Sequence, residues 1–360
     1  MAEESSTAWH LSVAVTTEED AKTQTTHGSG MRSPMTNDYQ FYFECAVVFL
    51  GVVGTAANAL ILYSLVASKQ HKKHMLIVNQ NVLDLFSSFF LVVSNAVKLC
   101  NIYLTGAVGY WLCILLLSES LVWLGANGSA VNLAAVTVDR YLKVIHPVGS
   151  KQKLRPWMMY SAMAFTWLVG IAYNVAPAFE TSRVIGGMCL PYVFFKSDVA
   201  KTASRILVVL CFYVIMLFIF IFCYGRILLA IRRQANVMVS YGGPSSSASQ
   251  AQTSQIQCNV IKTMILVCVL YAVARLPLSV HLMVLIFDPS ITPLDGRFFA
   301  SLFIASLYTT TNPFIYATKF DPVKKILRGM IPCKRISVQP GANDGSGGSQ
   351  PGRGTGQQRY

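Results

Sequence analysis

The stretch Asn312-Pro313-Phe314-Ile315-Tyr316 lies near the C-terminal end of the last long apolar segment of this 360-residue chain. A helix in lipid must satisfy its backbone hydrogen bonds internally. Pro313 removes one backbone donor, and Asn312 adds a polar group where polar groups are costly. Such a segment is tolerated only where it faces a packed interior. The stretch therefore predicts a membrane-spanning helix, inside a helical bundle, that bends at this point.

The composition of the whole chain agrees with a membrane protein. Hydrophobic residues make up 53% and charged residues 12% of the chain, whereas soluble domains carry about 25% charged residues. A spanning helix needs about 20 mostly apolar residues, and spanning strands would be about ten residues long and alternating. Seven continuous apolar stretches fit helices: Tyr42–Ala67, Met75–Lys98, Tyr110–Tyr141, Trp157–Phe179, Ala203–Ile231, Val260–Phe287 and Arg297–Thr318. The sequence predicts an all-α membrane protein, a seven-helix bundle over residues 42–318.

The segments outside these stretches are polar. Residues 1–41 are predicted to form a disordered N-terminus, residues 240–257 a flexible loop and residues 334–360 a disordered tail, because they cannot bury enough apolar surface to fold alone. Residues 1–38 have no apolar core, so we expect the first span to act as the signal anchor.

Basic residues set the expected orientation. They gather after the first, third, fifth and seventh stretches, which places the N-terminus outside and the C-terminus in the cytoplasm. The net charge of +13 is interpreted as attraction to the anionic inner leaflet of the bilayer. Nucleic-acid binding is not expected, because the basic residues are scattered over helix ends and form no single patch.

Several polar residues fall inside the predicted spans. Asn58 and Asn132 are interpreted first as hydrogen-bonding groups that hold helices together. Asp84 and Arg275 are interpreted as functional, because two opposite charges in one apolar bundle are costly.

An ordered set of residues connects the spans. The chain places in succession Asn58, Asp84, Asp139-Arg140-Tyr141, Trp167, Tyr224, Pro277 and Asn312-Pro313-Phe314-Ile315-Tyr316. Together these resemble the rhodopsin-like (class A) family of G-protein-coupled receptors, over roughly Phe43 to Cys333. The resemblance implies a multi-pass receptor of the plasma membrane, without enzymatic activity or cofactor. It implies a heterotrimeric G protein as partner, with arrestin and a receptor kinase.

The resemblance also implies roles for the matching residues at the cytoplasmic end. Arg140, flanked by Asp139 and Tyr141, would be restrained by Asp139 at rest and swing to receive the G protein. Tyr224 and Tyr316 would support the active arrangement. Pro277 would kink the sixth span, and the Asn312-Pro313 motif would bend the seventh.

Three further sites follow from the same resemblance. Asn58, Asp84 and Ser129, with Asn312, would form a polar core where many relatives hold a sodium ion. Cys113 would form a disulfide with Cys189. Residues 319–333 would form a membrane-surface helix that ends at Cys333, a candidate for palmitoylation with a free thiol as the alternative.

The departures from the family pattern are as informative as the matches. Arg275 stands where the family usually carries Trp, next to the expected polar core. It either pairs with Asp84 in place of a sodium ion or meets an anionic ligand, and both alternatives stay open. Cys113 lies about half a helical turn further from Arg140 than usual. The acidic residue often found at the inner base of the sixth span corresponds roughly to Gln257.

The sequence says least about which ligand the expected receptor binds. Val122 stands where amine receptors carry Asp, and Ser306 stands about where opsins carry the retinal-binding Lys, so neither chemistry is expected. A candidate outer pocket is drawn from helical spacing: Glu119, Val122, Trp123, Arg275, His281 and Tyr308. A short peptide is the preferred ligand, ahead of lipids and small organic anions. The alternative function is a transporter with a helical-bundle fold.

Overall fold

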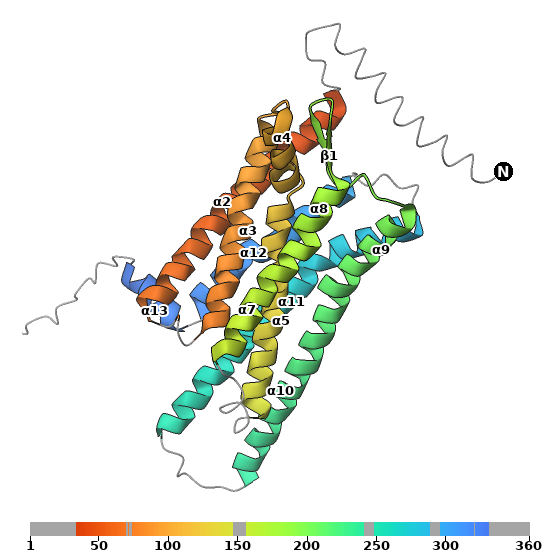
Figure 1. The fold of residues 1–360 in the computed structure, drawn as a ribbon. Helices are drawn as coiled ribbons and strands as arrows, with labels where there is room; N and C mark the ends of the chain where they lie inside the picture. Colours follow the sequence, from red (N-terminus) through yellow and green to blue (C-terminus); the bar gives the residue numbers. More distant parts are fainter. Residues whose placement is uncertain are drawn as a thin grey trace, which may run out of the picture.

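The computed structural model describes residues 34–69, 71, 74–146, 156–240, 248–288, 296–319 and 321–330. Within these ranges the chain is mostly helical (Figure 1). The elements, with η marking a π-helical turn, are α2 (Pro34–Ala67), α3 (Met75–Leu99), α4 (Gly106–Leu112), η1 (Cys113–Leu117), α5 (Ser120–Ile145), α7 (Pro156–Gly170), η2 (Ile171–Val175), α8 (Ala176–Thr181), β1 (Arg183–Ile185), β2 (Met188–Leu190), α9 (Asp198–Val209), η3 (Leu210–Val214), α10 (Ile215–Ser240), α11 (Ala248–Phe287), α12 (Gly296–Lys319) and α13 (Asp321–Met330).

Three of the spans run through a π-helical turn: α4–η1–α5, α7–η2–α8 and α9–η3–α10. Together with α2, α3, α11 and α12 they confirm the predicted seven-helix bundle. By length and composition, six described helices are able to cross a membrane: Gln40–Ala67, Met75–Leu99, Gly106–Ile145, Trp157–Thr181, Asp198–Arg233 and Ile261–Phe287. The remaining one, α12, is more polar.

The side-chain hydroxyls that make α12 more polar form hydrogen bonds within the helix itself. The hydroxyls of Ser306, Thr309, Thr310 and Thr311 donate to carbonyls three or four residues earlier in α12, at 2.8 to 3.1 Å. Such back-bonding satisfies a hydroxyl without water. The helix therefore fits the same apolar surroundings as its neighbours.

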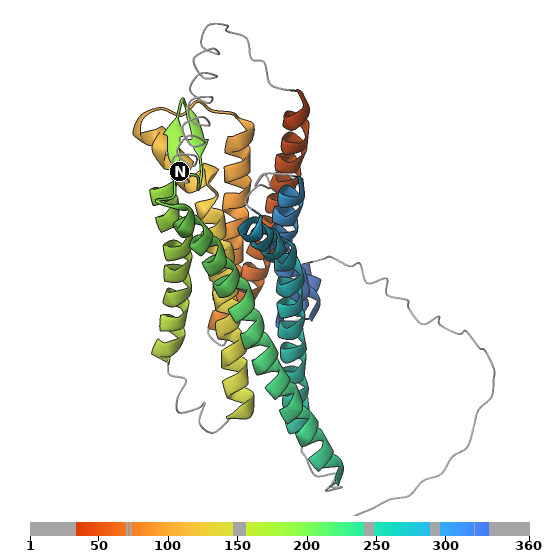
Figure 2. The same ribbon diagram turned by 90° about the vertical axis from the view of Figure 1, so that its right-hand side faces the viewer.

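The helices pack mostly beside their neighbours in sequence. Helix α2 contacts α3 and α12, α3 contacts α5, α5 contacts α7 and α10, and α11 contacts α12. The first and last long helices thus close the bundle. Figures 1 and 2 show α10 and α11 extending beyond the other helices at one end, while α4 and the β-hairpin lie at the opposite end. We call these the Arg140 end and the disulfide end, after residues on the third span.

The polar and apolar surfaces are inverted relative to a soluble protein. Phe49, Phe218 and Ile221 are 70 to 72% exposed on the outside of the bundle, whereas Asp84 and Asn312 are completely buried. Surroundings of lipid explain both observations, because apolar side chains then face an apolar solvent and polar ones must find partners inside.

Gly54 shows how closely three of these helices approach one another. A Cβ atom at this position would lie 2.5 Å from Cγ2 of Thr310 on α12 and 2.7 Å from Oγ of Ser88 on α3. Only a glycine allows α2 to sit this near both neighbours. The close contact brings the polar residues of the three helices within reach of each other.

Two of the expected disordered segments are partly helical. Helix α2 begins at Pro34 rather than Tyr42, consistent with the preference of proline for the first turn of a helix, so residues 34–41 belong to this helix. Ser240 ends α10, and residues 248–257 form the first turns of α11. Helix propagation from an adjacent span explains this, because each added residue gains one backbone bond without a new nucleation cost.

Other predicted boundaries fall wholly or partly outside the described residues. Residues 1–33, residues 241–247, and residues 331–360 with Cys333 belong to this group. Helix α13, at 321–330, forms within the segment predicted for the membrane-surface helix.

A short β-hairpin at the disulfide end was not predicted. Strands β1 and β2 pair antiparallel, with Val184 opposite Cys189. Gly186 and Gly187 join them with φ angles of +58° and +78°, which a two-residue hairpin turn requires. The carbonyl of Gly187 accepts from the backbone N–H of Leu104 at 2.9 Å. The hairpin is thereby fixed to the segment before α4.

Candidate functional site

The polar core is centred on the buried carboxylate of Asp84 on α3. Its Oδ1 accepts from Oγ of Ser129 on α5 at 2.6 Å, and its Oδ2 accepts from Nδ2 of Asn312 on α12 at 2.8 Å. All three side chains are completely buried. One carboxylate therefore joins three helices in a region where water cannot replace a lost partner.

Gln80 and Tyr308 extend this core. The Gln80 side-chain nitrogen donates to the Ser129 hydroxyl and, at 3.0 Å, to the Tyr308 hydroxyl. The Gln80 oxygen accepts from Nδ2 of Asn132 at 2.8 Å. One continuous network therefore links α3, α5 and α12. Neither Gln80 nor the position of Tyr308 in this network was predicted.

Asn132 continues the network toward α7. Its oxygen accepts from Nδ2 of Asn79 at 2.9 Å, and Asn79 also bonds Thr166 and Trp167 of α7 at 3.2 Å each. This arrangement agrees with the interpretation of Asn132 as a residue that holds helices together. The run Asn79-Gln80-Asn81 inside an apolar span was the signal in the sequence that could have indicated this network.

Asn58 is explained by the proline of α12. Pro313 has no N–H, so the carbonyl four residues earlier, on Thr309, loses its usual helical donor. Nδ2 of Asn58 donates to that carbonyl at 3.0 Å. Asn58 therefore supports the interrupted helix and does not bond Asp84 directly.

Arg275 does not join the polar core. It is 5% exposed, and its Nη2 donates to the side-chain oxygen of Asn127 on α5 at 3.1 Å. Its guanidinium carbon lies 5.1 Å from the ring centroid of Trp123 and 5.9 Å from that of Tyr271. Among the residues that the structure describes, no carboxylate forms an ion pair with it.

Of the two alternatives for Arg275, the pairing with Asp84 is therefore not formed in this structure. Two tyrosine side chains connect Arg275 to the Asp84 network. The ring of Tyr271 packs on Arg275 and, edge to face with 5.1 Å between ring centroids, on Tyr308. The Tyr308 hydroxyl lies within hydrogen-bond distance of Ser129, a partner of Asp84. Tyr271 was not singled out in the sequence. The alternative of contact with an anionic ligand stays a prediction.

The sodium ion considered at Asp84 stays a prediction. Sodium is a hard cation that prefers oxygen ligands, and in this arrangement both Asp84 oxygens already accept from Ser129 and Asn312. In the described residues no group of three or more His, Cys, Asp or Glu side chains is placed to hold a metal.

Near the Arg140 end of α5, the carboxylate of Asp139 faces two cations. Lys143 Nζ lies 2.8 Å from Asp139 Oδ2, whereas Arg140 Nε lies 3.8 Å from the same oxygen. Nη2 of Arg140 lies 3.5 Å from Nδ1 of His74, just before α3. These four residues line one small cleft. The rest of its lining comes from the start of α3, from Val136 of α5 and from Met159 of α7. The Asp139 restraint on Arg140 is thus weak, because Lys143 is the nearer partner.

The other predicted switch residues are not among those that line this cleft. Tyr224 and Tyr316 are 6% and 1% exposed and belong to the same hydrophobic cluster, and Thr137 donates to the Tyr224 hydroxyl at 3.4 Å. Tyr141 instead packs against Phe222 on α10. Pro277 lies within α11.

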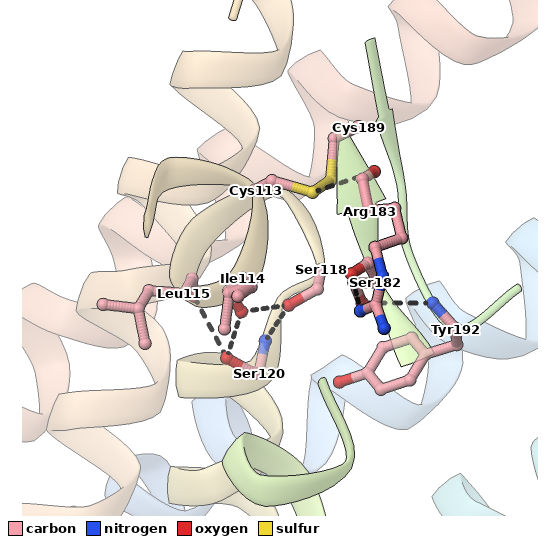
Figure 3. Close-up of a disulfide and its surroundings, with 9 residues drawn as sticks. All are labelled: Cys113, Ile114, Leu115, Ser118, Ser120, Ser182, Arg183, Cys189 and Tyr192. Carbon is pink, nitrogen blue, oxygen red and sulfur yellow. Dashed lines mark hydrogen bonds between the residues drawn. A yellow bond between two sulfur atoms is a disulfide. The ribbon is translucent and has the colours of Figure 1, made fainter. Parts of the chain in front are cut away.

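The Cys113–Cys189 disulfide is present in spite of the unusual spacing, with 5.3 Å between the Cα atoms. The third span accommodates the extra half turn by a break: η1 is followed by Ser118 and by Glu119, whose φ is +56°. Figure 3 shows the Ser118 and Ser120 hydroxyls directed at the Ile114 carbonyl. These bonds satisfy a carbonyl at the break.

The tyrosine after the hairpin helps to hold this end of the bundle together. The backbone N–H of Tyr192 donates to Ser182 Oγ at 3.2 Å, and its hydroxyl donates to the Asn174 carbonyl at 3.4 Å. Burial raises the pKa of Tyr192 to about 12. The hydroxyl therefore remains protonated, and a donor, over the physiological pH range.

The six candidate pocket residues do not form one group. Trp123 and Arg275 are in contact, but Glu119 pairs with Lys98 of α3, and Tyr308 belongs to the Asp84 network. The other two are engaged in packing: Val122 against Val47 and Leu91, and His281 against Phe298. Helical spacing did not account for the left-handed backbone at Glu119 or for the rotation of α11 and α12 relative to α5.

Seven lipid-facing helices around a buried polar network define a membrane protein of the helical-bundle class. Residues 57–316 match the family described as "7 transmembrane receptor (rhodopsin family)". The chain belongs to this family, the rhodopsin-like (class A) G-protein-coupled receptors. It is a family of receptors, so the comparisons favour neither an enzyme nor the alternative of a transporter.

Individual relatives are distant. Human melanopsin is 25% identical over 82% of this chain and 63% of its own length. "Opsin-1, short-wave-sensitive 1" of Danio rerio is 26% identical over 66% of this chain and 71% of its own length. "Rhodopsin, GQ-coupled" of Mizuhopecten yessoensis is 22% identical over 83% of this chain and 61% of its own length. The chain thus spans less than two thirds of the length of the melanopsins it matches.

The fold has a solved counterpart. The crystal structure of squid rhodopsin matches with a TM-score of 0.67 and 16% identity, covering 85% of this chain and 91% of that one. These relatives are opsins, which are light receptors, so the comparisons give no support to a peptide ligand.

Proposed function

We propose that this chain is a receptor of the plasma membrane whose disulfide end faces outward and whose Arg140 end activates a heterotrimeric G protein. The observation that carries this proposal is the state of Arg140. Its guanidinium lines a cleft at the end of the bundle and is paired only loosely with Asp139, at 3.8 Å, whereas Lys143 lies 2.8 Å from the same oxygen. A cation in this state is available to an incoming protein segment. The orientation rests on the positive-inside distribution of basic residues.

The stimulus we propose is a bound ligand rather than a covalently attached retinal. The described part of α12 has one lysine, Lys319, and it is the last residue of the helix. Ser306, at about the position of the opsin lysine, instead donates to the Leu302 carbonyl at 2.9 Å. A serine hydroxyl cannot form a Schiff base. The likeness to opsins therefore supports the architecture and the switch, not light absorption by an attached chromophore.

Ligand binding would act by shifting a population of two bundle arrangements. The contacts offer a route: Trp123 and Arg275 on one side, then Tyr271 and Tyr308, then the network of Asp84 and Asn312. A ligand that changes the position of Arg275 would change the packing of both tyrosines. Arrestin and a receptor kinase are proposed partners of the active arrangement.

The proposal is tested by guanine-nucleotide exchange on several G-protein classes, measured in parallel in cells that express the full chain. We expect exchange above vector control for at least one class. The Gq class is the first to examine, because one relative is named as Gq-coupled. Verified surface expression without exchange on any class, in the presence of a broad ligand library, would contradict the proposal. Antibody access to tags at Met1 and Tyr360 tests the orientation.

Lys143→Met is expected to lower ligand-independent exchange at least twofold. In the present structure Lys143 occupies the Asp139 carboxylate at 2.8 Å. Without that ammonium group the carboxylate is free to draw in Arg140, now 3.8 Å away, and to restrain it. The measurement is basal exchange normalised to surface expression. Lys262→Met, an exposed lysine on α11, is the matched control, and an unchanged or raised basal rate in Lys143→Met would refute this role.

A further inference from the structure

Arg275 is a buried cation without a counter-charge. It is 5% exposed, and no described carboxylate pairs with it. The carboxylate of Asp84, in the neighbouring network, already accepts from Ser129 and Asn312. An ion removed from water without a partner costs several kcal/mol. A protein that retains such a charge in its interior needs something else to neutralise it.

The guanidinium is also incompletely bonded. Its Nη2 donates to Asn127 at 3.1 Å, but Nε is buried and makes no hydrogen bond. Two aromatic faces, of Trp123 and Tyr271, lie against the guanidinium. Cation–π contacts stabilise a charge but leave its N–H groups unused. The Nε–H is thus a buried donor that lacks an acceptor.

Asn127 is itself held in place. Its Nδ2 donates to Oδ1 of Asn174 on η2 at 3.0 Å, and Asn174 in turn donates to the Gly170 carbonyl at 2.8 Å. The oxygen of Asn127 is therefore fixed toward Arg275. The acceptor that orients the guanidinium is uncharged, so this hydrogen bond does not neutralise the positive charge of Arg275.

We propose that Arg275 is the binding site for the carboxylate group of a small organic ligand, whose apolar part packs on Trp123. Arginine suits this role because its planar donors match the two oxygens of a carboxylate. The inference rests on the proposed function, because it names the chemical class of the ligand that the receptor detects. It names the chemical group of the ligand that would neutralise the buried charge.

The experiment uses the purified full chain in lipid nanodiscs and measures the midpoint of thermal unfolding. The probes are acetate, butyrate and benzoate at constant ionic strength, with benzamide as the uncharged counterpart of benzoate and chloride as the inorganic anion. We expect at least one carboxylate to raise the midpoint by several degrees, because a ligand bound only to the folded state stabilises it. Benzamide and chloride are expected to leave it unchanged.

Three variants identify the site. Arg275→Gln removes the charge and is expected to abolish the effect of the carboxylate. Arg205→Gln, on α9, removes a guanidinium that donates to the Leu285 carbonyl, and the carboxylate effect is expected to persist. Asn127→Asp places a carboxylate beside Arg275 and is expected to raise the midpoint without any probe and to abolish the response to carboxylates. This last variant keeps the test valid if Arg275→Gln fails to fold.

The inference is overturned if no carboxylate shifts the midpoint of the wild-type chain, if chloride alone does so, or if the shift survives in Asn127→Asp. These readouts do not involve a G protein. A receptor that exchanges nucleotide but ignores carboxylates would refute only the ligand class, and a chain that binds carboxylates without exchange would refute only the proposed function.

Discussion

Arg140→Ala is expected to abolish guanine-nucleotide exchange, with a loss of at least tenfold against the wild-type chain. The guanidinium is the one group of the cleft that the proposed mechanism requires an incoming G-protein segment to contact. Its intramolecular contacts are long, 3.8 Å to Asp139 and 3.5 Å to His74. Removing it should therefore disturb the resting fold little. The measurement is exchange per receptor at the cell surface.

The control for Arg140→Ala removes the same charge from the same end of the bundle. Arg232 lies exposed on α10, and Arg232→Ala is expected to retain more than half of the exchange. The midpoint of thermal unfolding should be unchanged in both variants. Wild-type exchange in Arg140→Ala would show that the switch residue is elsewhere, whereas a large drop in the unfolding midpoint would show that Arg140 is structural.

Asp84→Ala is expected to lower the free energy of unfolding by about 3 kcal/mol, because it leaves the buried donors of Ser129 and Asn312 without their acceptor. Asp84→Asn keeps one acceptor oxygen and should cost less, about 1 kcal/mol. The measurement is the shift of the thermal unfolding midpoint in nanodiscs.

Glu44 provides the matched control for Asp84. It is another buried carboxylate within a span, 6% exposed, but its bond is to Gln40 one turn away on the same helix, at 2.8 Å. Glu44→Ala removes no bond between helices and should shift the midpoint clearly less. Equal shifts for Asp84→Ala and Glu44→Ala would mean that the network joining three helices adds no stability of its own.

The sequence predicted residues whose chemistry is local. Pro313 with Asn312 indicated an interrupted helix, because proline lacks an N–H wherever it stands. Apolar stretches longer than about 20 residues indicated the spans, because bilayer thickness alone sets that length. Asp84 inside such a stretch indicated a functional position, because a charge at bilayer depth is costly, and the family resemblance implied the polar core around it. The helix ends were less predictable, since α2 and α11 continue into polar residues at no new nucleation cost.

Partners between helices could not be predicted in the same way. The residue before α5, Glu119, has a left-handed backbone, so its side chain does not follow the helical spacing that was used to place it beside Val122 and Trp123. The place of Tyr308 depended on the rotation of another helix, α12.

The sequence by itself determined that this is a bundle of membrane helices with an acid, Asp84, and a cation, Arg275, inside its spans, because segment length, proline and charge act through each residue's own chemistry. The ordered motifs added the resemblance to the rhodopsin-like family. Only the tertiary structure decided that Asp84 meets Asn312, that Asn58 supports the carbonyl released by Pro313, and that Arg275 lies behind two tyrosine rings without a counter-charge. Those pairings depend on which helix faces bring side chains within about 3 Å, and sequence spacing on one helix does not specify the rotation of another.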